Sequence, residues 1–107
     1  MVIKLRTKKP DRVLNQIIKA VEQYAEGHPN AEIEVYRYSS VSVRIRIIDP
    51  DFKRQSRAQR EDDLWAIFDQ LPEEVVAEIS LLLLLTPAEA KKSFANTEFD
   101  DPIPSRI

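Results

Sequence analysis

The sequence predicts an α+β domain in which a small three-stranded mixed sheet carries helices on one face, in the order α-β-β-α-β-α. Three observations predict this class. Residues 13–25 carry apolar side chains at helical spacing, residues 32–48 alternate apolar and polar side chains, and residues 79–85 are apolar almost without a break. Helical spacing indicates a helix with one buried face, whereas alternation indicates strands with one wet face.

The size and composition indicate a single domain that spans residues 1–107. A chain of 107 residues that is 43% hydrophobic and 32% charged has enough apolar material for a core of its own. The lack of cysteine excludes disulfides, thiolate metal sites and cysteine nucleophiles. The first residues lack the long apolar region of a secretory signal. We therefore expect a cytoplasmic protein with no metal, no cofactor and no membrane association.

Charge is distributed unevenly along the chain. Residues 1–60 contain 13 Lys and Arg against 7 Asp and Glu, a balance of +6, whereas residues 61–107 contain 3 against 11, a balance of −8. Such asymmetry can indicate a basic binding face in the first half. We favour the simpler interpretation that the two halves pair with each other. Residues 1–9 are interpreted as a basic N-terminal segment outside the sheet.

The first helix is predicted to begin near Pro10 and Asp11, because Asp is a preferred N-cap residue. Gly27, the only glycine, stands where a left-handed C-cap belongs, and Pro29 blocks continuation of the helix. Between these limits one apolar stripe follows the helical spacing, formed by Val13, Leu14, Ile17, Ile18, Val21, Tyr24 and Ala25.

Two strands are predicted at residues 32–38 and 41–48, joined as a hairpin. A strict two-residue loop would set a core side chain opposite an arginine. A three-residue loop at residues 38–40 instead sets Val35 opposite Val43 and brings glutamates opposite arginines on the wet face. Because a slip of one residue inverts the faces of a strand, the three-residue loop is favoured.

The second helix is predicted to begin after Ser56, which forms a capping box with Gln59, and to end before Pro72. A further helical turn follows at residues 72–76. Residues 79–85 fit either a buried helix or a strand buried on both faces. The strand is favoured, because a sheet of two strands alone is marginal. The helical crossover makes this strand parallel to the second, through a right-handed connection.

The C-terminal part begins with a second capping box, formed by Thr86 and Glu89 with proline at the first helical position. A short last helix should run from there to about Phe94. The tail, residues 96–107, contains two prolines and is expected to be extended.

Residues 11–92 resemble the BolA family, whose fold is similar to that of type II KH domains. The resemblance rests on the order of the elements, and on the motifs Asp51-Phe52, Arg57-x-x-Arg60 and Thr86-Pro87-x-Glu89. It implies the fold, but not the iron–sulfur chemistry of the family. BolA-like proteins have a cluster-ligand histidine just before the third strand, where this chain has Ala77 and Glu78. The glycine-rich loop with which KH domains grip nucleic acid is also missing.

A basic cluster at the start of the second helix is a candidate site for an anion or a nucleic acid. It is formed by Lys53, Arg54, Arg57 and Arg60. Free backbone N–H groups at a helix N-terminus attract phosphate, which would offset the cost of placing arginines there. Tyr36 beside Arg44 would add base stacking for a single strand. The alternative, ranked ahead, is that these arginines pair with carboxylates along the helix, Arg60 with Asp63.

The leucine strand is a candidate protein interface. If alternate leucines face the helices, either Leu82 and Leu84 or their neighbours face the open side of the sheet. Exposed together they would form an apolar patch of the kind that marks an interface. A protein partner, a second copy or the chain's own tail would cover this patch. The tail is favoured, because it retains Phe94, Phe99 and Ile103.

The sequence predicts no catalytic site. His28, the only histidine, is interpreted as an exposed turn residue without partners near it in sequence. Acidic pairs such as Asp49-x-Asp51 fit strand ends and helix surfaces, and lack the spacing of a calcium loop. We therefore expect a small non-catalytic binding or adaptor protein that contacts protein partners. Nucleic-acid binding is the alternative, and a hydrolase whose carboxylates meet only in the fold is a distant third.

Overall fold

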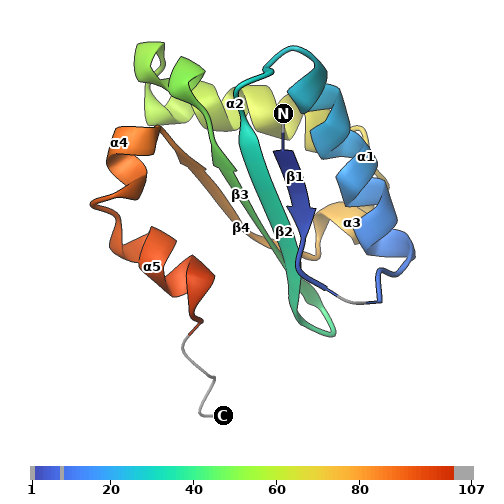
Figure 1. Ribbon diagram of the computed structural model, residues 1–107. Helices are drawn as coiled ribbons and strands as arrows, with labels where there is room; N and C mark the ends of the chain where they lie inside the picture. The colour runs from blue at the N-terminus through green and yellow to red at the C-terminus, as the bar shows by residue number, and fades with distance from the viewer. Residues whose placement is uncertain (1, 8, 103–107) are drawn as a thin grey trace.

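The computed structural model describes residues 2–7 and 9–102, and shows an α+β fold built on a four-stranded mixed sheet (Figure 1). The strands follow one another across the sheet in chain order, and only the central pair, β2 and β3, is antiparallel. The elements are β1 (Val2–Leu5), α1 (Arg12–Glu26), β2 (Glu32–Ser39), β3 (Ser42–Ile48), the 3₁₀ helix η1 (Pro50–Arg54), α2 (Arg57–Phe68), α3 (Glu73–Val76), β4 (Ile79–Leu85), α4 (Pro87–Ala90) and α5 (Phe94–Asp100).

Helix α1 has the predicted boundaries, with one difference at its end. The side chain of Asp11 accepts a hydrogen bond from the N–H of Leu14 at 2.9 Å, which makes it the predicted N-cap. Gly27 closes the helix at φ −90° and ψ −2°, so the predicted left-handed cap is wrong. A right-handed turn suffices here because the N–H of Gly27 bonds to the carbonyl of Tyr24 within the last turn.

The prediction of a three-stranded sheet is wrong, because part of the N-terminal segment forms β1. This strand runs parallel to β2 at the edge of the sheet, with Ile3 paired to Ile33 and Leu5 to Val35. Ile3 and Leu5 pack against the core, whereas Lys4 between them is exposed. The alternation of apolar and basic residues is too short here to predict a strand from the sequence.

The hairpin keeps the predicted faces in a different register. Val35 pairs with Ile45 rather than with the predicted Val43, a shift of two residues. The turn has two residues, 40 and 41, and a register shift between Arg37 and Ser39 takes up the extra residue. Because this bulge restores the alternation, a two-residue turn no longer sets core side chains opposite arginines.

Residues 79–85 form the predicted strand, parallel to β3. The capping boxes that precede α2 and α4 are both present. The predicted last helix, however, is interrupted: α4 ends at Ala90, and α5 begins at Phe94 with Ser93 as its N-cap. The core fills the space between the sheet and the first three α-helices, with Phe52, Phe68 and Ile45 fully buried.

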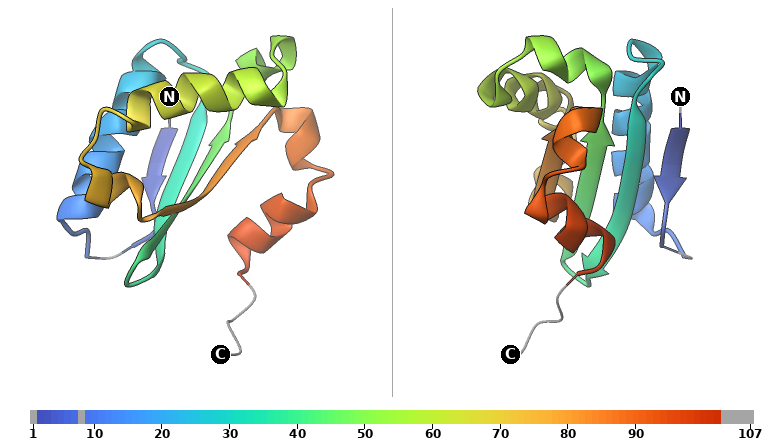
Figure 2. Two further views of the ribbon diagram at one scale, coloured as in Figure 1. Left: turned by 180° about the vertical axis from the view of Figure 1, so that it is seen from behind. Right: turned by 60° about the vertical axis from the view of Figure 1, so that its left-hand side comes forward.

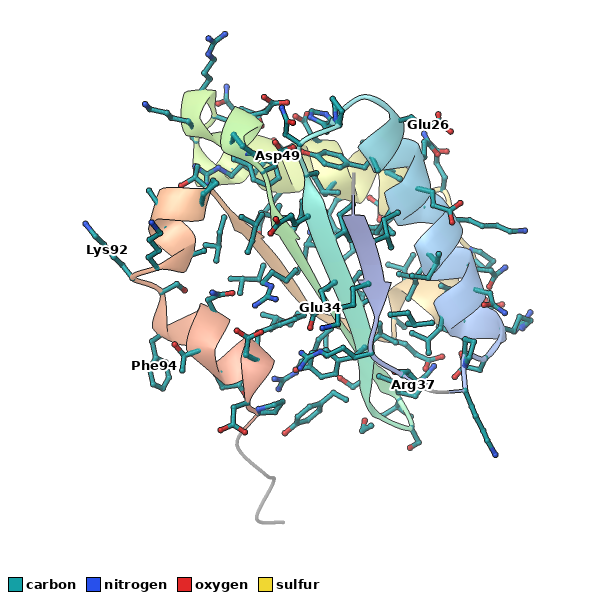
Figure 3. All side chains as sticks on the ribbon, in the orientation of Figure 1. Glu26, Glu34, Arg37, Asp49, Lys92 and Phe94 are labelled. Carbon is teal, nitrogen blue, oxygen red and sulfur yellow. The ribbon has the colours of Figure 1, made fainter. Side chains whose placement is uncertain are left out.

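The prediction that all helices lie on one face is also wrong, and so is the prediction of an extended tail for residues 96–100, which belong to α5. Helix α5 packs on the face of the sheet opposite α1, as the two views of Figure 2 show. Within α5, Phe99 is fully buried, so it covers the open face as predicted for the tail. Phe94 is 78% exposed and does not cover this face (Figure 3). Ile103 lies outside the described residues.

Among the described residues, every helix is too short or too polar to cross a membrane.

Candidate functional site

The sheet face under α5 brings arginines and tyrosines together, and we call it the arginine face. It consists of Arg6, Tyr36, Tyr38, Arg44 and Arg46. The residues on β2 and β3 reach this face by strand alternation, since their neighbours Val35 and Ile45 are buried on the other side. Arg6 follows directly after β1 and completes the row. The face therefore combines three guanidinium groups with two phenol rings.

Arg44 donates a bifurcated hydrogen bond to a carboxylate of α5. Its Nη1 lies 2.7 and 2.9 Å from the two carboxylate oxygens of Glu98, and 3.3 Å from the hydroxyl of Tyr36. Its guanidinium also stacks over the ring of Tyr38, 3.7 Å from the centroid. Burial acts to lower the pKa of Arg44, but the hydrogen bonds to Glu98 and Tyr36 outweigh it and raise the pKa. The guanidinium is therefore fully charged and turned toward α5.

Arg46 contacts α5 at two positions, near its start and at its end. Its Nη1 donates to Asp100 at 2.7 Å and to the side-chain oxygen of Asn96 at 2.8 Å. The second terminal nitrogen donates to Glu34 at 3.1 Å, which lies directly opposite on β2. Glu34, labelled in Figure 3, also pairs with Arg6. A single carboxylate of the sheet thus positions two of the three arginines.

Phe99 is the anchor between these two ion pairs. Its ring meets the ring of Tyr36 edge to face at 4.9 Å and lies beneath the guanidinium of Arg46 at 4.7 Å. Arg6 stacks over Tyr36 and donates to the carbonyl of Phe99 at 2.8 Å. The arginine face therefore binds the sequence Glu98-Phe99-Asp100 through two carboxylates and the aromatic ring between them.

Helix α5 covers only part of the arginine face. A hollow of about 470 Å³ opens beside its first turn, between Tyr38, Leu81 and Phe94. A second hollow of about 250 Å³ lies at the β1–β2 end of the face, beside Lys4, Glu34 and Arg46. The face thus extends beyond the segment that occupies it.

The predicted basic cluster does not form one surface. Lys53, Arg54 and Arg57 are exposed, whereas Arg60 is 4% exposed and points inward. Two of its nitrogens donate to the carbonyl of Phe52, and Nη1 lies 2.6 Å from Oε1 of Glu89. The hydrogen bond to Arg60 lowers the pKa of Glu89 to about 2. The predicted pairing of Arg60 with Asp63 is wrong, because the partner lies on α4.

The predicted interface leucines face the helices. Leu82 and Leu84 pair with Ile45 and Ile47, whose side chains are buried in the core. Leu84 is accordingly only 8% exposed, and Leu82 packs against the same core. Of the two arrangements that the sequence left open, the one with Leu82 and Leu84 inside is present. The tail covers the other face through Phe99.

His28 is a half-buried residue with close partners, not an isolated turn residue. Its Nδ1 lies 3.0 Å from Asp51 and 3.2 Å from Asp49, and its ring stacks on Tyr24. The hydroxyl of Tyr24 in turn donates to Asp49 at 2.7 Å. Sequence reasoning missed this group because its members come from α1, the following turn and the end of β3.

Comparison of the chain with protein-family models, with curated proteins and with solved structures found no match. The candidate site is therefore assigned from its geometry. Of its residues, Tyr36 and Arg44 were predicted as a binding pair, but Arg6, Arg46 and the acidic residues of α5 were not. Two features of the sequence point to these residues: arginines recur on the polar face of the hairpin, and the C-terminal part of the chain is acidic.

Proposed function

We propose that this chain is a non-catalytic protein-binding module whose arginine face recognises an acidic segment with a central aromatic residue. The observation that carries the proposal is the way the face holds its own C-terminal segment, with Arg44 on Glu98, Arg46 on Asp100 and Phe99 between them. In this proposal α5 occupies the binding face in cis, and a partner segment of the same chemistry replaces it.

Helix α5 is held on the sheet in the way that a bound peptide is held, so another segment can replace it. A helix of seven residues is too short to be stable by itself, so docking must hold it. The described hydrogen bonds between α5 and the sheet all use arginine side chains rather than a backbone ladder. Exchange of this segment therefore leaves the ladders of β2 and β3 intact.

The alternative functions of the sequence analysis stay predictions. A nucleic acid would also suit a face of arginines and tyrosines. The face, however, is matched here by two carboxylates and a phenyl ring, which is the chemistry of a peptide. The resemblance to the BolA family likewise stays a prediction: the order from α1 to α4 contains the predicted one, and β1 and α5 are additional.

The experiment measures binding of a fluorescent peptide that copies residues 93–101. The cis segment competes at an effective concentration on the order of millimolar, so the wild-type chain should bind the peptide weakly. In the full-length Phe99→Ala variant the cis segment loses its anchor. We expect this variant to bind the peptide at least tenfold more tightly, and the additional change Arg44→Ala to remove the gain.

The matched control is Phe94→Ala, which removes the exposed phenylalanine of the same helix and should leave binding at the wild-type level. A control peptide with alanine in place of the phenylalanine equivalent to Phe99 should not bind. The proposal fails if Phe99→Ala binds the peptide no better than wild type while NMR shows α5 released. If an oligonucleotide of deoxythymidines binds and the peptide does not, the arginine face is a nucleic-acid-binding surface instead.

A further inference from the structure

The group formed by His28, Asp49 and Asp51 shares no residue with the arginine face and is not used in the binding proposed above. It joins the turn after α1 to the end of β3, where Asp49 is labelled in Figure 3. One ligand atom from each residue lies within 4.8 Å of the other two. The imidazole Nδ1 is 3.0 Å from Asp51 and 3.2 Å from Asp49. Such separations also match neighbouring ligands around an ion bound at about 2.1 Å.

The three groups are held in place by the surrounding structure. Tyr24 stacks on the imidazole with the two rings 3° from parallel and 4.0 Å apart, which fixes the plane of the ring. The same tyrosine donates to Oδ2 of Asp49, and Oδ1 of Asp49 accepts from the backbone N–H of Asp51. Contacts of this kind orient ligands in metal sites, because they select the ring position and the carboxylate rotamer in advance.

The donor set is mixed and carries excess negative charge. Two carboxylates converge on one imidazole nitrogen, and Asp49 is fully buried. Since a protonated Nδ1 carries one hydrogen, it donates a well-aligned hydrogen bond to only one of the two carboxylates at a time.

Space for further ligands is available beside the imidazole. A hollow of about 360 Å³ lies against His28, bounded by Tyr24, Gln55 and Asp63. Asp51 is 58% exposed, so an ion has a route from solvent to the group. Because Asp51 is exposed, solvent water would complete the coordination of an ion that three protein ligands leave open.

We propose that His28, Asp49 and Asp51 bind a divalent first-row transition ion, with Zn²⁺ as the expected best fit. One imidazole and two carboxylates suit such ions better than Mg²⁺ or Ca²⁺, which prefer oxygen ligands alone. Nδ1 of His28 must be unprotonated to bind: an imidazolium releases that proton to solvent, whereas a neutral ring protonated at Nδ1 carries its proton on Nε2 once the ion is bound. The ion links α1 to β3 and neutralises the buried carboxylate.

The test is calorimetric titration of the chelator-treated full chain with ZnCl₂, and separately with MgCl₂. We expect one Zn²⁺ per chain, and at least tenfold weaker binding after His28→Ala and after Asp51→Asn. Glu26→Gln is the matched control, because Glu26 is an exposed carboxylate on the last turn of α1 near His28. It should bind as wild type, and MgCl₂ should produce no comparable signal.

A second measurement separates a metal site from a hydrogen-bonded cluster and needs no substitution. The ¹⁵N chemical shift of His28 Nδ1 in the wild-type chain should move strongly with one equivalent of Zn²⁺ to that of a metal-bound nitrogen, with Nε2 carrying the ring proton in the bound state. If that shift stays in place, or if His28→Ala binds Zn²⁺ as tightly as wild type, the group is a hydrogen-bonded cluster only and the proposal is overturned.

Discussion

Arg60 and Glu89 join α2 to α4 across the end of β4, with Nη1 and Oε1 2.6 Å apart. The same guanidinium donates to the carbonyls of Phe52 and Leu84, so one side chain ties three segments together. Glu89 meanwhile caps α4, since its side chain accepts from the N–H of Thr86 at 2.9 Å. This pair is a structural clamp, and it explains why an arginine stands in the unfavourable first turn of α2.

Removing the clamp should destabilise the fold. Arg60→Ala leaves two carbonyls and the carboxylate of Glu89 without their donor, and should lower the free energy of unfolding by about 2–4 kcal/mol. Urea unfolding followed by the fluorescence of Trp65 measures this change. Arg57→Ala is the control: this side chain is exposed one turn earlier, and its loss should cost less than about 0.5 kcal/mol. Equal costs for the two variants would contradict the clamp.

The clamp also predicts a dependence of stability on pH. The pKa of Glu89 is lowered to about 2, below its ordinary value of 4.5. A lowered folded-state pKa stabilises the fold above the unfolded-state pKa, and this contribution is lost as the pH falls from about 4.5 to about 2. Glu89→Gln should therefore be less stable than wild type at pH 7, and the difference should shrink over that interval. A difference that is constant from pH 7 to pH 2 would show that the charge of Glu89 does not contribute.

The buried carboxylate of Asp49 predicts a coupling with Tyr24. Tyr24→Phe removes the hydroxyl that donates to Asp49 at 2.7 Å and should cost about 1–3 kcal/mol, because a buried charge loses a donor. In the background of Asp49→Asn the same change should cost clearly less. A double-mutant cycle by urea unfolding measures the coupling energy. Purely additive costs would mean that the two side chains contribute separately.

Release of α5 should be a local event. Phe99→Ala removes the buried anchor of a seven-residue helix, whereas the ladder between β2 and β3 does not depend on it. Amide hydrogen exchange should show faster exchange within α5, and unchanged protection of Val43, Ile45 and Ile47. Loss of protection across the whole sheet would show that α5 is an integral part of the core.

Most of the fold could be predicted from local patterns. The capping boxes at Ser56 and Thr86 define helix starts by themselves, because the residues that satisfy one another lie three positions apart. The register of the hairpin could not be predicted, since a bulge between Arg37 and Ser39 changes the pairing without changing the faces. Strand β1 and helix α5 depend on packing against the sheet more than on their own short sequences.

The candidate site could be predicted only in part. Alternation along β3 placed Arg44 and Arg46 together on the wet face of the sheet. Their partners Glu98 and Asp100 are more than 50 positions away, and a single sequence carries no signal that joins them. The same reason applies to Arg60, whose predicted partner lay on its own helix while the actual partner, Glu89, lies on another.

The central claim is that the arginine face binds an acidic segment with a central aromatic residue, in cis or in trans. The most direct test is an NMR titration of labelled Phe99→Ala with the peptide that copies residues 93–101. We expect that the peptide returns the backbone amide shifts of Tyr36, Arg44 and Arg46 to their wild-type positions. Shifts that stay at the variant's positions, or that move only on the face covered by α1, would contradict it.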